Sequence, residues 1–244
     1  MSGSLPKGVE TDVDLDAESR RVIAEYERRE RDQPPDYYAL HHLRNLFVRQ
    51  EHERMLLRCL RLAGLVPLSE RRVLEVGCGH GEWLAVFESL GARRENVAGI
   101  ELGHQRAEQA NRRLPGSDIR AGDAARLPWS DQSFDVVFQR MMFTSILDPT
   151  VRRVAAEEMM RVARPDGAIV WVDFFINPFN PQVRCLGRKD IHDLFPGWQA
   201  TLYRTTLAPP LSRRLVNISW GLARALEQLR IFNTFYFGFL QRRR

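Results

Sequence analysis

The chain has 244 residues, of which 44% are hydrophobic and 27% are charged. This balance predicts a globular protein of one or two domains and excludes a mainly disordered chain. The net charge of +5, from 36 basic and 31 acidic residues, is mild and spread out. Such a charge permits an anionic partner but does not require nucleic acid.

The three cysteines are far apart and include no C-x-x-C pair. We therefore expect no disulfide framework and no metal site, and we place the protein in a reducing cytoplasm. The polar N-terminus lacks the apolar core of a signal peptide. No uninterrupted apolar run reaches about 18 residues, so we expect no transmembrane helix.

The N-terminal quarter of the chain is predicted to be helical. Residues 1–14 are expected to be a disordered tail, followed by a helix at 15–32 that ends before a proline pair. A second helical region, broken once, is expected at 37–62. Together these helices form a cap, residues 15–65, that we expect to cover the functional site.

From residue 72 onward strands and helices alternate, which favours a parallel sheet covered on both faces. In chain order the expected elements are a strand at 72–76, a helix at 82–89, a strand at 97–101, a helix at 104–113, strands at 118–121 and 134–139, a helix at 150–162, a turn at 164–167, a strand at 168–174, a helix at 188–194, a strand at 199–206 and a helical stretch at 212–229.

The aromatic run at 235–240 is predicted to be a final buried strand. Aromatic residues favour strands, and Gly238 disfavours a helix. A membrane-surface helix flanked by the arginines at 242–244 is the alternative.

A glycine-rich turn after the first predicted strand is the most informative feature. Glu75, Gly77, Gly79 and Gly81 occupy alternate positions. Glycines permit a tight turn and let a ligand approach the backbone closely. Dinucleotide sites usually have the spacing G-x-G-x-x-G, whereas this turn has G-x-G-x-G.

Two acids follow neighbouring strands and complete a candidate nucleotide site. Glu101 lies 20 residues after Gly81, a spacing at which an acid can accept hydrogen bonds from ribose hydroxyls. Asp123 follows the third strand, where its carboxylate can accept a bond from an adenine amine while the Ala124 N–H serves a ring nitrogen. For both acids, capping of a helical turn is the alternative.

With these motifs, residues 72–174 resemble the core of the class I S-adenosylmethionine-dependent methyltransferases, of the kind called the type 11 methyltransferase domain. The resemblance implies an α/β fold with a Rossmann-like, mostly parallel sheet of seven strands, the last antiparallel. We assign 66–244 to this domain, with a helical insertion at about 208–230. The cofactor implied is S-adenosyl-L-methionine, and the residues expected to contact it are Glu75, Gly77, Cys78, Gly79, Gly81, Glu101, Leu102, Asp123, Ala124, Gln139 and, from the cap, Arg49.

Four flanking segments resemble bacterial methyltransferases of glycan or secondary-metabolite pathways. They are residues 45–51, 145–149, 177–181 and 206–211. This resemblance favours a small-molecule or sugar acceptor, with methylation of oxygen preferred.

A hydroxyl acceptor would need a group that takes its proton. His41 and His42 in the cap and Asp173 near the end of the fifth strand are the catalytic candidates. The alternatives are a packed and a solvated histidine, and an aspartate bonded to loop backbone. Arg140 is a candidate for an anionic acceptor group or the methionine carboxylate.

Three other functions stay open. A NAD-dependent oxidoreductase is disfavoured by the glycine spacing, and a non-catalytic methyltransferase-like binding protein by the intact glycines and acids. An RNA methyltransferase is disfavoured because no RNA-binding module is recognised. The lack of a D/N-P-P-[YF] sequence argues against DNA as a partner. A homodimer through the apolar C-terminal segment also stays open.

Overall fold

The computed structural model describes residues 11–177, 180 and 182–243, with side chains from residue 16. The expected tail at 1–14 therefore lies mostly outside the described residues, as does part of the 177–181 segment. The first helix begins at Thr11, four residues before the predicted start.

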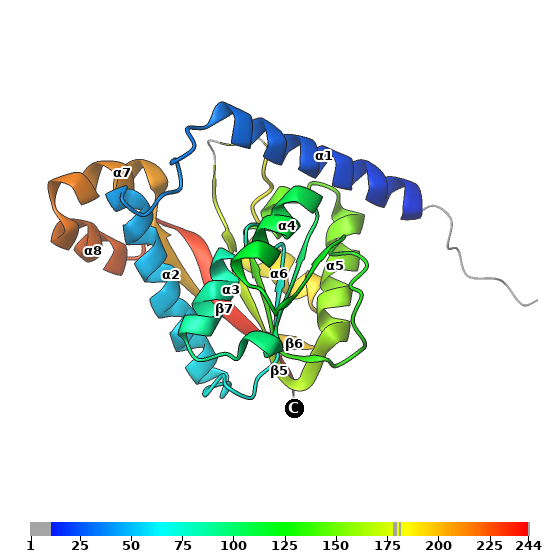
Figure 1. The fold of residues 1–244 in the computed structure, drawn as a ribbon. Helices are drawn as coiled ribbons and strands as arrows, with labels where there is room; N and C mark the ends of the chain where they lie inside the picture. Colours follow the sequence, from blue (N-terminus) through cyan, green and yellow to red (C-terminus); the bar gives the residue numbers. More distant parts are fainter. Residues whose placement is uncertain (1–10, 178–179, 181, 244) are drawn as a thin grey trace, which may run out of the picture.

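Seven strands form one sheet in the order β3-β2-β1-β4-β5-β7-β6 (Figure 1). β7 is antiparallel to both of its neighbours, and the other pairings are parallel. This confirms the predicted class, a Rossmann-like and mostly parallel sheet with an antiparallel last strand. The strands are β1 Val73–Val76, β2 Val97–Glu101, β3 Asp118–Ala121, β4 Phe134–Arg140, β5 Ala163–Phe174, β6 Trp198–Leu207 and β7 Asn233–Arg242.

Helices cover both faces of the sheet. They are α1 Thr11–Asp32, α2 Leu43–Leu62, α3 Glu82–Ser89, α4 His104–Arg113, α5 Pro149–Val162, α6 Arg188–Leu194, α7 Pro209–Ile218 and α8 Trp220–Gln228, with 3₁₀ turns at Arg94–Asn96 and Phe143–Ser145. None of these described helices is long and apolar enough to cross a bilayer.

Alternating side chains of the strands build two cores, one on each face of the sheet. Val137 and Trp171 pack in the core that includes residues of α5 and α6. Phe138 and Val170 pack in the core that includes residues of α2 and α3. Because both faces are buried, the central strands are mostly apolar, as is typical of parallel sheets, and Glu75 and Gln139 are among their few buried polar residues.

The structure corrects the prediction in three places. The expected helical stretch at 212–229 is two helices, because Ser219 ends α7 and caps α8 by accepting a hydrogen bond from the Leu222 N–H at 3.2 Å. β5 begins at Ala163, five residues early, because Ala163 already pairs with Phe134. The following residues, 164–166, are an exposed interruption of that pairing.

The aromatic run at 235–240 is a buried part of β7, between β5 and β6. The membrane-surface helix considered for this run is therefore wrong. Parallel strands end at one edge of the sheet, and α1 crosses above that edge in Figure 1.

Candidate functional site

The glycine turn after β1 adopts backbone conformations that favour glycine. The φ angles of Gly77, Gly79 and Gly81 are +77°, +55° and +76°. A Cβ atom on Gly77 would lie 3.2 Å from the Cγ of Met142, so a side chain there would also crowd the turn. The turn is fixed to the neighbouring strand because the Gly77 N–H donates to the carbonyl of Ile100 at 2.9 Å.

Glu101, the predicted ribose acid, is the end of β2 and is buried. Its two carboxylate oxygens accept hydrogen bonds from the backbone N–H groups of Gly79, at 2.9 Å, and Gly103, at 3.0 Å. A guanidinium nitrogen of Arg106 lies 3.3 Å from the same carboxylate. The acid therefore links the glycine turn to the start of α4.

Asp123, the predicted adenine acid, uses its two oxygens differently. Oδ1 accepts from the Ala125 N–H at 2.8 Å, which is the turn-capping alternative. Oδ2 accepts from the hydroxyl of Ser19, in α1, at 2.5 Å. One oxygen thus organises the local turn, and the other faces the covering helix.

These groups border a pocket whose free space, open to solvent, is about 630 Å³. Its lining residues are Glu18, Ser19, Val22, Tyr26, Gly77, Ile100, Glu101, Leu102, Arg106, Gly122, Asp123, Ala124, Arg140, Met142, Ser145, Ile146 and Val151. Five residues predicted to contact the cofactor are among them, namely Gly77, Glu101, Leu102, Asp123 and Ala124.

The other predicted cofactor residues support the turn and do not line this pocket. Glu75 is buried on β1, and burial raises the pKa of its carboxyl well above the usual range. Gln139, on β4, accepts a bond from the Met142 N–H at 3.2 Å. Cys78 is buried, and burial raises its thiol pKa, as expected for a packing residue.

Gly79 and Gly81 shape the turn, and Arg49 lies further out on α2. The Arg49 guanidinium stacks over the ring of Trp83, 4.6 Å from its centroid, and pairs with Glu53 at 2.5 Å. Arg49 is therefore held outside the pocket lining in this structure.

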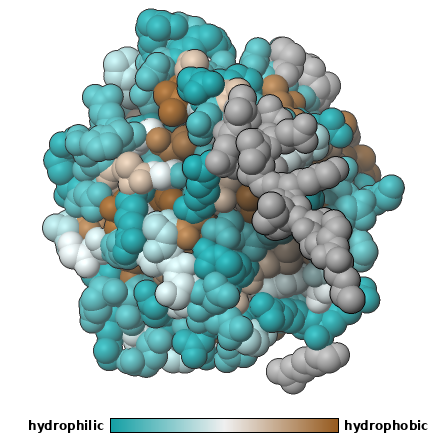
Figure 2. Space-filling model, turned by 90° about the vertical axis from the view of Figure 1, so that its right-hand side faces the viewer, coloured by the Kyte–Doolittle hydropathy of each residue, from teal (hydrophilic) through white to brown (hydrophobic). Residues whose placement is uncertain are grey.

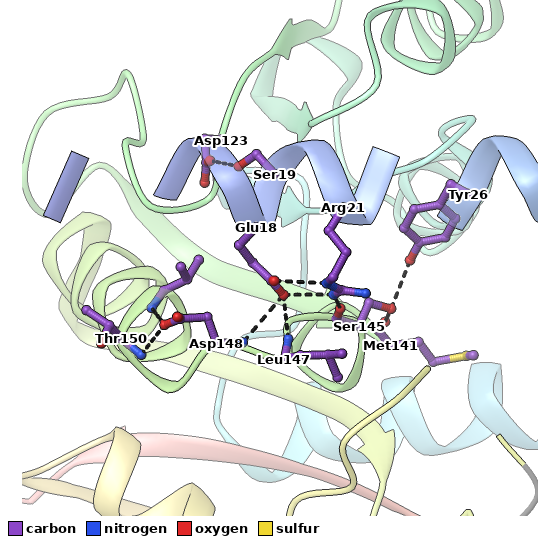
Figure 3. Close-up of polar contacts among 11 residues, drawn as sticks. Glu18, Ser19, Arg21, Tyr26, Asp123, Met141, Ser145, Leu147, Asp148 and Thr150 are labelled. Atoms are coloured by element: carbon purple, nitrogen blue, oxygen red, sulfur yellow. Dashed lines mark hydrogen bonds and ion pairs between the residues drawn. The ribbon is translucent and has the colours of Figure 1, made fainter. Parts of the chain in front are cut away.

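Helix α1 closes one side of the pocket (Figure 3). Glu18 accepts a hydrogen bond from the Leu147 N–H at 2.5 Å and pairs with Arg21, which also donates to the carbonyl of Ser145. The Tyr26 hydroxyl lies 3.1 Å from the Ser145 Oγ. The sequence predicts a covering helix but does not predict these contacts. Residues 18, 22 and 26 are nevertheless spaced so that they lie on one face of a helix.

The Ser19–Asp123 bond makes a prediction about ligand access. We expect Ser19→Ala to tighten binding of S-adenosylhomocysteine about fivefold. In this variant Asp123 Oδ2 lacks its hydrogen bond from Ser19, so the ligand does not compete with that bond. Calorimetry measures this, with Ser130→Ala, an exposed serine outside the pocket lining, as the control. Weaker binding by the Ser19 variant would contradict this expectation and would assign the serine to the bound state.

His41 and His42 lie on the surface between α1 and α2. The Nε2 atom of each is 3.2 Å from a carboxylate oxygen of Asp36. The nitrogen and oxygen atoms with which these three residues could bind a metal ion lie within 4.8 Å of one another. Neither histidine is among the residues that line the pocket.

Asp173, the third catalytic candidate, is buried near the end of β5. Its carboxylate accepts hydrogen bonds from the hydroxyl of Thr144, at 2.6 Å, and from the N–H groups of Thr144 and Phe174, at 3.1 and 3.0 Å. These contacts are the loop hydrogen bonds named above as its alternative. Burial raises the pKa of Asp173 to about 7.

This raised pKa predicts a pH-dependent stability. Between the ordinary pKa of 3.8 and the folded value of about 7, the folded protein holds a proton that the unfolded chain has lost. The free energy of unfolding therefore falls as pH rises through this window. We expect Asp173→Asn to lack this decline, as measured by urea unfolding over a pH series, whereas the exposed Asp166→Asn should follow the wild type. Parallel profiles for Asp173→Asn and wild type would contradict the prediction.

Sequence reasoning missed a buried histidine, His52, behind the pocket. Its Nε2 lies 2.7 Å from the Thr206 hydroxyl, and its Nδ1 accepts from Arg140 at 3.3 Å. Burial and the nearby Arg140 lower the pKa of His52 well below its usual value. The neutral ring therefore positions Arg140, which lines the pocket. In the sequence, the one indication that His52 is buried is its spacing from Met55 and Leu56, with which it shares a face of α2.

The chain is similar to known methyltransferases. Residues 74–171 match a family model described as a methyltransferase domain. The chain is 36% identical over 163 residues to the phthiotriol/phenolphthiotriol dimycocerosates methyltransferase of Mycobacterium tuberculosis, a match that covers 64% of this chain and 52% of the relative. It is 34% identical over 125 residues to the 27-O-demethylrifamycin SV methyltransferase of Amycolatopsis mediterranei, covering 48% of this chain and 44% of the relative. The chain spans about half the length of the curated relatives it matches.

A solved structure shows the same fold. The S-adenosylmethionine-dependent methyltransferase of Mesorhizobium loti aligns with a TM-score of 0.57 at 15% identity, covering 77% of this chain and 98% of that protein. The match of residues 74–171 to a methyltransferase domain favours a methyltransferase over an oxidoreductase. Residues 74–171 are therefore similar to a methyltransferase domain, and the chain has the fold of a solved S-adenosylmethionine-dependent methyltransferase.

Proposed function

We propose that this chain transfers a methyl group from S-adenosylmethionine to a hydroxyl of a small, largely apolar acceptor of lipid or polyketide type. The observation that carries the proposal is the pocket in which the glycine turn and two acids meet apolar side chains from β4 onward. The names of the relatives specify a dimycocerosate and a rifamycin, and the second name specifies an oxygen. A sugar acceptor is the second option that the sequence suggested.

The residues present fit the cofactor. Glu101 offers a buried carboxylate for ribose hydroxyls, and Asp123 with Ala124 can serve an adenine edge. Gly77 leaves the backbone open where a Cβ would crowd Met142. When bound, S-adenosylmethionine supplies a methyl group on a positively charged sulfur.

The rest of the pocket is suited to hold and orient an apolar acceptor. Val22, Met142, Ile146 and Val151 provide apolar surface, and α1 covers one side of the site. Orientation and exclusion of water are the contributions that such a transfer needs from the protein. Because His41, His42 and Asp173 are absent from the pocket lining, the proposal rests on orientation more than on a dedicated base.

We also keep a cytoplasmic location in the proposal. The sequence supports this location, because its three cysteines are far apart and include no C-x-x-C pair.

The test is incubation of the protein with methyl-labelled S-adenosylmethionine and separate pools of hydroxylated lipids and polyketides, sugars, and RNA, followed by mass spectrometry. We expect label in the lipid and polyketide pool, as an O-methyl group. Label in RNA or sugar alone would overturn the proposed acceptor class. Lack of binding to S-adenosylmethionine would favour the non-catalytic alternative.

A further inference from the structure

The segment 208–232, which comprises α7, α8 and the turn after them, lies between β6 and β7 in the chain and beside α2 (Figure 1). Eleven large apolar side chains are exposed in the described part of the protein, and five of them lie in these 25 residues. They are Ile218, Leu222, Leu229, Ile231 and Phe232, with exposed fractions of 77%, 47%, 57%, 74% and 44%. Such a concentration of exposed apolar side chains in one segment is a candidate interaction site.

The inner side of this segment is firmly packed. Trp220 lies edge-on to Phe47 of α2, with ring centroids 5.2 Å apart. Arg224 pairs with Glu51 at 2.9 Å, and the backbone N–H of Ala208 bonds the carbonyl of Phe232 at 2.9 Å. The apolar side chains are therefore held outward on an ordered support.

The apolar surface continues onto the residues that lead into α2. Tyr38, Leu40 and Leu43 have exposed fractions of 67%, 48% and 44%. Arg213 of α7 donates to the hydroxyl of Tyr37 at 2.9 Å, so α7 contacts this region directly. We call these two neighbouring parts together the α7–α8 surface.

Segment 208–232 is positively charged. Arg213, Arg214 and Arg230 are exposed, whereas Glu227, the one acid in segment 208–232, is buried and paired with Arg224 at 2.5 Å. The four arginines and one glutamate of the segment give a net charge of +3. Exposed arginines among exposed leucine, isoleucine and phenylalanine are typical of helices that lie in the interface of an anionic membrane.

We propose that the α7–α8 surface docks the protein on an anionic lipid bilayer, with its apolar side chains among the headgroups and its arginines at lipid phosphates. The face turned toward the viewer in Figure 2, on the other side from α7 and α8, is largely hydrophilic with small apolar areas. Docking through α7 and α8 would leave that face in water. The proposal adds a membrane partner to the proposed function.

The test is co-sedimentation of the full chain with vesicles of phosphatidylcholine alone or mixed with phosphatidylglycerol. We expect binding to the anionic vesicles and at least about tenfold weaker binding to the neutral ones. Ile218→Glu with Ile231→Glu should reduce binding to anionic vesicles at least about tenfold. Arg213→Gln with Arg214→Gln should weaken binding by about tenfold and reduce its dependence on salt.

Leu62→Glu is the matched control, because Leu62 is a 55% exposed leucine at the far end of α2. It should bind vesicles as the wild type does, and all variants should keep the wild-type melting temperature and affinity for S-adenosylhomocysteine. Equal binding by the Ile218/Ile231 variant and wild type overturns the proposal. So does an absence of vesicle binding with a dimer that this variant dissociates, which would assign the surface to self-association. Vesicle binding needs no methyl transfer, so its failure leaves the proposed function standing.

Discussion

Replacing Glu101 with alanine is expected to weaken binding of S-adenosylhomocysteine at least about a hundredfold. Two ribose hydroxyls would lose a charged acceptor, and each such hydrogen bond contributes roughly 1.5–3 kcal/mol. The same carboxylate holds the N–H groups of Gly79 and Gly103, so the variant also loosens the turn that forms the pocket wall. Both effects act in the same direction on affinity.

Calorimetry with the demethylated product measures this loss without requiring knowledge of the acceptor. Glu70→Ala is the matched control, because Glu70 is an exposed glutamate that pairs with Arg93 at 2.6 Å outside the pocket. Glu101→Gln keeps the side-chain length but loses the charge, so we expect an affinity between those of the wild type and the alanine variant. Unchanged affinity in Glu101→Ala would contradict the assignment of this acid to the cofactor.

Local sequence patterns predicted the sheet and the glycine turn well. The residues at 97–101 favour a strand by themselves, and the predicted bounds agree with those of β2. The spacing from Gly81 to Glu101 reflects one strand, one helix and one strand, a unit whose geometry is shared by nucleotide-binding folds. Such features depend on residues close together in the chain.

Contacts between distant residues could not be predicted in this way. Ser19 and Asp123 are 104 positions apart, and His52 and Thr206 are 154 apart, yet each pair forms a hydrogen bond. Helix α1 shows a face with a periodic pattern, but the pattern does not specify which loop it will cover. The same limit applies to Asp173. Its place at a strand end makes it a candidate base in the sequence, whereas its hydrogen bonds to Thr144 join residues 29 positions apart.

Gly238 disfavours a helix in the sequence, and in the structure the close packing of neighbouring strands requires a glycine at this position. In the structure it lies in β7 opposite Trp171 of β5 and Leu202 of β6. A Cβ atom at this position would lie 2.1 Å from the carbonyl oxygen of Thr201 and 2.9 Å from the Cα of Leu202.

We therefore expect Gly238→Ala to lower the free energy of unfolding by about 3 kcal/mol, near the upper end for an overpacked core. The clashing atoms belong to the backbone of β6, and β7 is paired on both sides, so neither strand can shift without breaking the ladder. Urea unfolding followed by circular dichroism measures the change. Gly221→Ala is the matched control, because its nearest non-neighbouring atom would be 3.9 Å away and alanine favours the helix α8 that contains it. If the Gly238 variant is as stable as this control, then β6 is not held as close to β7 as the structure indicates.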